Sequence, residues 1–167
     1  MIRLLITLGL LSSTTTWAIG ADLARGCFAR VYDRAHLARH PDQIVMDVKL
    51  HIVKPHDYFA LRMRVRGRNE ALSTTGYCYM PEPPEPPGVN CIVECDGGSF
   101  RVVPHANHAM MYLDWIRIFP VSTRDQDLIA VCAGDLPKGS KEVSGGKDDR
   151  VFRLSRVADR MCAGVKP

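Results

Sequence analysis

Six cysteines carry the clearest chemistry in this sequence. They are Cys27, Cys78, Cys91, Cys95, Cys132 and Cys162. An even number of thiols behind an export leader is typical of a disulfide framework. Cys91 and Cys95 have a zinc-like spacing, but an exported chain meets oxidants first, so we predict disulfides and no metal site. Spacing alone leaves the connectivity open. We expect Cys27 to pair with Cys162, and the other four to pair among themselves.

Two pairs of histidines have the spacing for metal binding or acid–base chemistry. His36 and His40 are one helical turn apart, and His105 and His108 lie in one loop. A zinc site built from these four is one hypothesis. However, Leu37 follows His36 where a His-Glu-x-x-His metalloprotease has glutamate. We therefore expect solvated or capping histidines, and keep a His-based metal-dependent enzyme as an alternative.

The sequence contains no recognisable nucleophile motif. Ser99 follows Asp96-Gly97-Gly98, but no Gly-x-Ser-x-Gly elbow occurs anywhere in the chain. We predict a non-enzymatic protein with no catalytic residue and no cofactor.

Arginines at every second position form a candidate binding face. Arg62, Arg64, Arg66 and Arg68 have the spacing of one strand face, roughly 7 Å between successive side chains. A row of guanidinium groups suits an extended anionic partner, such as an anionic envelope polymer. The alternative is a solvated strand face that discourages edge-to-edge aggregation.

These side chains must be positioned by β-strands, because alternation with period two dominates the sequence. Residues 44–52 alternate apolar and polar side chains, and so do residues 59–66. The four residues 54–57 join the two runs, which predicts a β-hairpin with Val53 opposite Tyr58. In this register Leu50 faces Leu61 on the core side, and Asp47 opposes Arg64 on the outer side.

Further strands are expected around this hairpin. They cover residues 27–32, 72–80, 91–95, 99–103, 110–119, 128–132 and 151–154, with a bulge or break near Trp115. Two short helices are expected, 34–40 capped by Asp33 and 156–162 capped by Ser155. The segments 81–88 and 137–149 are predicted to be loops. About eight strands in succession, joined mostly by short connections, favour an all-β, antiparallel, calycin-like barrel, with a two-sheet sandwich as the alternative.

The N-terminus has the pattern of a secretory signal peptide. Arg3 precedes an apolar run, and small residues end the segment at Gly20. We predict cleavage before Ala21, which leaves residues 21–167 as one disulfide-stapled, soluble β-domain in the periplasm or outside the cell. No later segment is long and apolar enough to span a membrane. The formal net charge of +4 argues against a nucleic-acid binder.

Three short stretches resemble known sequences. Residues 27–32, 35–43 and 91–98 resemble a group of small exported bacterial proteins of unknown function. The resemblance implies export and a cysteine-bearing domain, and it implies no ligand or catalytic residue. We therefore predict an exported binding or envelope-associated domain with an unknown, anionic ligand. The alternatives are a small-ligand carrier with a hollow barrel and the metal-dependent enzyme.

Overall fold

The computed structural model describes residues 24–53, 58–82, 85–123, 132, 134 and 136–165. The predicted signal peptide, the hairpin loop 54–57 and nearly all of the predicted strand 128–132 lie outside the described residues. The elements, in chain order, are β1 (Gly26–Val31), α2 (Arg34–Arg39), β2 (Val45–Val53), β3 (Tyr58–Val65), β4 (Leu72–Tyr79), β5 (Val89–Val93), β6 (Gly98–Pro104), β7 (His108–Pro120), β8 (Lys141–Ser144), β9 (Val151–Val157) and the 3-10 helix η1 (Asp159–Cys162).

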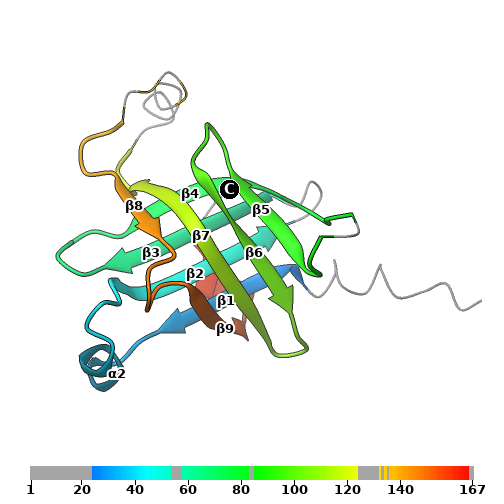
Figure 1. The fold of residues 1–167 in the computed structure, drawn as a ribbon, viewed down its shortest axis with the longest axis horizontal. Coiled ribbons are helices and arrows are strands. Elements are labelled where there is room, and N and C mark those ends of the chain that lie inside the picture. Colours follow the sequence, from blue (N-terminus) through cyan, green and yellow to red (C-terminus); the bar gives the residue numbers. More distant parts are fainter. Residues whose placement is uncertain are drawn as a thin grey trace, which may run out of the picture.

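The strands form a closed antiparallel barrel of eight strands with one extra strand, which confirms the predicted fold class. Each strand from β1 to β7 pairs with its successor, β9 pairs with β7, and the β1–β9 ladder closes the barrel. Strands β5, β6 and β7 run steeply across β1, β2 and β3, so that the two groups form opposite walls (Figure 1). The long strand β7 pairs with β9 through its first half and with β8 through its second half.

The hairpin of β2 and β3 has the register expected from the sequence. Leu50 lies opposite Leu61, Val53 opposite Tyr58, and Asp47 opposite Arg64. The Arg64 Nε and Asp47 Oδ2 atoms are 3.3 Å apart. Alternation therefore identified the buried face correctly, because a shift of one residue would expose every apolar side chain.

The inside of the barrel is filled with apolar side chains. All eight barrel strands contribute to one buried cluster, which includes Phe28, Leu50, Phe100 and Phe152. The rings of Phe59 and Phe100 meet edge to face, with centroids 4.9 Å apart. An eight-stranded barrel is narrow enough for side chains to fill it. The filled interior leaves the surface of the barrel as the place where a ligand can bind.

Three disulfides join the cysteines, and the predicted pairing is confirmed. Cys27 bonds Cys162, while Cys78 bonds Cys91 and Cys95 bonds Cys132. The first bond joins β1 to η1, and the second crosses from β4 to β5. Three disulfides indicate that the chain resides in an oxidising environment.

Several local predictions were wrong or incomplete. The helix expected at 156–162 is confined to η1, because Ser155 and Val157 belong to β9 and pair with β1. Strand β8 lies within the predicted loop 137–149, where it pairs with the second half of β7. By contrast, Asp33 caps α2 as expected: its Oδ1 accepts a hydrogen bond from the His36 N–H at 2.7 Å. Among the described residues, no helix has the length and apolar character needed to cross a membrane.

Candidate functional site

The predicted arginine row is only partly a strand face. Arg62 and Arg64 lie on the outer side of β3, where Arg62 is half-buried and Arg64 is exposed. Strand β3 ends at Val65, and the chain turns at Gly67 with φ of +76°. Arg66 and Arg68 therefore leave the face that two-residue spacing predicted for them.

Arg64 and Arg66 have partners within the part of the chain that the structure describes. Arg64 pairs with Asp47. Arg66 Nη2 donates to the carbonyl oxygens of Leu37 at 2.6 Å and His40 at 3.2 Å, at the end of α2. Leu37 lies in the last turn of α2, where carbonyls lack partners within the helix, so Arg66 helps to cap its C-terminus. The row thus contributes to folding as well as to surface charge.

A more compact group of basic side chains lies beside α2. A pocket of about 330 Å³ is formed there by α2, the end of β1, the β6–β7 turn and β9. Its lining residues are Arg30, Tyr32, His36, Asn107, His108, Arg153 and Ser155. None of these described lining residues is acidic. We call this group the basic pocket.

The sheet register explains how distant segments meet at the basic pocket. Ser155 of β9 lies opposite Ala29 of β1 on one side and opposite His108 of β7 on the other. Arg30 follows Ala29 at the point where the β1–β9 ladder ends. Arg153 lies two residues before Ser155 and therefore shares its outward face. Side chains from three strands are thus brought together by two ladders.

An aromatic column forms one wall of the basic pocket. The Tyr32 and His36 rings stack with centroids 4.6 Å apart, and His36 stacks on His40 at 4.3 Å. The Arg30 guanidinium lies 5.2 Å from the centre of the Tyr32 ring, within the range of a cation–π interaction. His40 Nδ1 lies 3.5 Å from Asp148 Oδ1. His40 therefore faces an acidic partner outside the pocket, whereas His36 lines the pocket.

Hydrogen bonds fix which ring nitrogens carry a proton. The Gln43 side-chain nitrogen donates to the Val45 carbonyl at 2.7 Å, so its oxygen is the atom that accepts from His36 Nε2 at 3.0 Å. His108 Nδ1 lies 2.9 Å from Asn107 Oδ1, to which it donates. In the neutral rings, the other nitrogen of each histidine is an acceptor; it becomes a donor when the ring is protonated.

The surroundings of the basic pocket favour neutral His108 and protonated Tyr32. Desolvation, followed by the charges of Arg153 and His105, lowers the pKa of His108 below its ordinary value. Burial raises the pKa of Tyr32; the Asp149 carboxylate also raises it, while Arg30 opposes the change. Tyr32 therefore keeps its hydroxyl proton at neutral pH. An anion that entered the pocket would meet arginines and a phenol, and it would favour protonation of His108.

The four histidines do not form a metal site among the described residues. His36 and His108 share the basic pocket, whereas His40 and His105 are not among its lining residues. His105 stacks on His108, with ring centroids 4.4 Å apart. No group of three or more His, Cys, Asp or Glu side chains in the described part of the chain is arranged to hold a metal ion.

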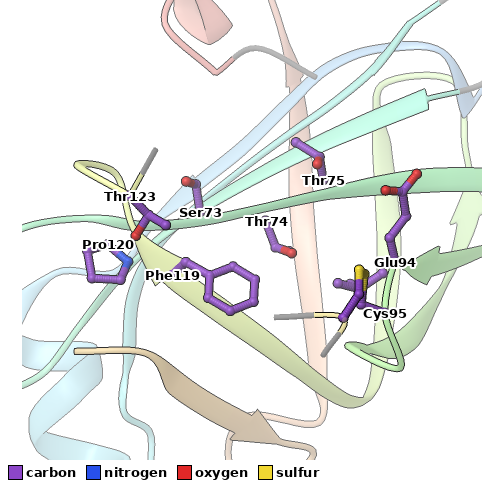
Figure 2. Close-up of a pocket in the computed structure, with 10 residues that line it drawn as sticks. Ser73, Thr74, Thr75, Glu94, Cys95, Phe119, Pro120 and Thr123 are labelled. Atoms are coloured by element: carbon purple, nitrogen blue, oxygen red, sulfur yellow. A yellow bond between two sulfur atoms is a disulfide. The ribbon is translucent and has the colours of Figure 1, made fainter. Parts of the chain in front are cut away.

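A second pocket lies where β4 meets β7, beside the Cys95–Cys132 disulfide. It has a volume of about 210 Å³ and is lined by Ser73, Thr74, Thr75, Val93, Glu94, Cys95, Phe119, Pro120, Thr123 and Cys132. Glu94 and Cys95 lie at one end of the pocket, and Pro120 and Thr123 lie at the other (Figure 2). Its hydroxyl groups and single carboxylate carry less binding chemistry than the basic pocket. Residues 124–131, which follow Thr123, lie outside the described part of the chain.

Sequence reasoning missed most residues of the basic pocket. It named His36 and His108 but gave no role to Arg30, Tyr32 or Arg153. A signal was present, since Arg30 and Tyr32 lie at the end of the predicted strand 27–32, directly before the capped helix. No family model, curated protein or solved structure matches this chain.

Proposed function

We propose that this protein is an exported, periplasmic or secreted domain that acts by binding a compact anion in the basic pocket. The observation that carries the proposal is the lining of the basic pocket, which includes two arginines, two histidines and a tyrosine. None of the described lining residues is acidic. Arg30 and Arg153 supply permanent positive charge, and a guanidinium group matches the oxygens of phosphate, sulfate or carboxylate. The leader and the disulfides support export.

Proton uptake accompanies binding in this proposal. His108 is held neutral by its surroundings and offers an acceptor nitrogen in that state. A bound anion lowers the cost of protonation, and the imidazolium then donates a hydrogen bond to it. The affinity for the anion therefore increases as the pH falls through the pKa of the histidine.

Calorimetric titration of the full chain with sulfate tests the proposal, because sulfate keeps its charge across the useful pH range. The Arg30→Ala/Arg153→Ala variant should bind sulfate about 10-fold to 100-fold more weakly, as expected for lost charge-assisted hydrogen bonds. Arg62→Ala/Arg64→Ala removes the same number of arginines outside the pocket and is the matched control. Unchanged affinity in the first variant would overturn the site, and a loss only in the control would assign binding to the arginine row.

Two further measurements separate this proposal from its alternatives. Wild-type affinity for sulfate should be higher at mildly acidic than at mildly alkaline pH, and His108→Gln should flatten that dependence. Repeating the titration with added zinc addresses the metal-dependent alternative. Sulfate binding that requires zinc would contradict direct binding by the arginines.

A further inference from the structure

A different surface, on the outer side of β4, β5, β6 and β7, carries aromatic side chains in a regular arrangement. One row across these strands runs Tyr79, Asn90, Arg101 and Tyr112, each opposite the next. The adjacent row runs Tyr77, Ile92, Ser99 and Trp115. Each row thus has an aromatic residue at both ends and smaller or polar residues between them. Three strand spacings make each row about 14 Å long.

Each row coincides with a hollow in the surface. The hollow over the first row has a volume of about 340 Å³ and includes Tyr79, Arg101 and Tyr112 in its lining. The hollow over the second row has a volume of about 440 Å³ and includes Tyr77 and Trp115. Ile92 lines both hollows, so they adjoin. Figure 1 shows β5, β6 and β7 side by side where this aromatic face lies.

The aromatic side chains of this face are available for contact. Tyr77 and Tyr79 are 43% and 41% exposed, although both carry large apolar rings. The Arg101 guanidinium lies 4.8 Å from the centre of the Tyr112 ring, which holds both side chains in place. The residues that precede Tyr77, Tyr79 and Tyr112 are buried on the opposite side of the sheet, which makes the face rigid.

We infer that this aromatic face binds a neutral glycan chain. Sugar rings present C–H faces that pack on aromatic rings and hydroxyl groups that both donate and accept hydrogen bonds. The two hollows supply both kinds of partner. Asp114 accepts a hydrogen bond from the Ser99 hydroxyl at 3.2 Å, and Arg101 and Arg150 supply donors. Amphipathic aromatic residues flanked by polar groups are suited to such a ligand.

The charges of the face argue against a polyanion. Asp114 lies in the first hollow together with Arg101 and Arg150, and Glu94 and Asp96 line the second hollow. A uniformly charged strand of nucleic acid would meet these carboxylates along with the arginines, whereas a neutral chain of hydroxyl groups satisfies both signs.

The closed sheet argues against an extended peptide. Strand β5 pairs with β4 and β6, and β6 pairs with β5 and β7. Neither strand therefore offers a free backbone edge for strand addition. Recognition on this face therefore depends on side chains, as it does for a sugar ring stacked on an aromatic platform.

Fluorescence of Trp115 provides a direct test. The chain has two tryptophans, and Trp17 lies in the predicted signal peptide, so the exported residues 21–167 carry Trp115, which lies in the second hollow, as the single reporter. The probes are neutral hexasaccharides of β-linked glucose, α-linked glucose and β-linked N-acetylglucosamine. We expect at least one of them to change the emission of Trp115 saturably, with an affinity that is insensitive to salt.

Variants at the ends of the rows locate the binding site. Tyr77→Ala and Tyr79→Ala should each weaken hexasaccharide binding about tenfold, because each removes one stacking surface. Val31→Ala is the control, since Val31 is 62% exposed on β1, which pairs with no strand of this face, and lines neither hollow.

The outcomes of these titrations support or overturn glycan binding by the aromatic face. No response to any of the three hexasaccharides would overturn the proposal, and so would an equal loss of affinity in Val31→Ala. Tighter, strongly salt-dependent binding of single-stranded DNA at the same residues would replace the glycan by a polyanion. The result is independent of sulfate binding, because Arg30→Ala/Arg153→Ala should leave hexasaccharide binding unchanged.

Discussion

Removing single disulfides should lower stability in an order set by the length of chain that each one closes. Cys27–Cys162 spans 135 residues, whereas Cys78–Cys91 spans 13. A cross-link restricts the unfolded chain more when its loop is longer. The loop-closure relation gives about 5 kcal/mol for the first bond and about 3 kcal/mol for the second. The free energies of unfolding should therefore differ by about 2 kcal/mol between the two variants.

The comparison is well matched because both pairs are buried. The exposed fractions are 0% and 2% for Cys27 and Cys162, and 5% and 0% for Cys78 and Cys91. Replacing either pair by alanines removes similar amounts of buried sulfur, so the packing losses should largely cancel in the comparison. The remaining difference in the free energy of unfolding then measures how strongly each disulfide restricts the unfolded chain.

Urea unfolding, followed by circular dichroism, provides the measurement. We expect the order wild type, Cys78→Ala/Cys91→Ala, Cys27→Ala/Cys162→Ala in decreasing free energy of unfolding. If the last variant is unfolded without urea while the other stays folded, the order is still supported. Equal losses, or a larger loss for Cys78→Ala/Cys91→Ala, would refute the reasoning.

Two further predictions concern the core and a buried carboxyl group. Leu61→Ala should lower the free energy of unfolding by about 2–5 kcal/mol because Leu61 is fully buried, whereas Arg64→Ala should cost at most about 1 kcal/mol; similar urea midpoints for the two variants would contradict the assigned facing. Burial raises the pKa of Asp149 above 3.8 despite hydrogen bonds from the Ile44 and Val45 N–H groups, so this residue's contribution to stability is present at low pH and lost as the pH rises through the raised pKa. Urea unfolding over a pH series should therefore show a flatter profile for Asp149→Asn than for the wild type, and parallel profiles would contradict the raised pKa.

The β2–β3 hairpin was predictable because its information is local. Apolar side chains at every second position must share one face, and the length of the connection sets the register. The cap at Asp33 is equally local, since it involves a residue only three positions away. The same alternation favoured the barrel, because consecutive strands with short connections pair with their neighbours.

Strand β8 and the end of β9 could not be predicted in the same way. Within β8, Val143 is the one apolar residue, and the neighbouring side chains are polar. It is a strand because the second half of β7 offers an unpaired edge beside it. Likewise, Ser155 has the character of a helix cap, but ladders on both sides hold it in β9. Backbone pairing over long distances outweighed local preference at both places.

The amino-acid sequence by itself determined the β2–β3 hairpin with its inward-facing residues, the set of disulfide-forming cysteines and the expectation of export. These properties follow from periodicity and composition, which act over a few residues. The tertiary structure alone decided that Arg30, His108 and Arg153 share one pocket and that Tyr79 and Tyr112 lie at the two ends of one row. Such groupings depend on ladder registers between strands far apart in the chain. A surface site emerges when closure of the barrel brings those strands together.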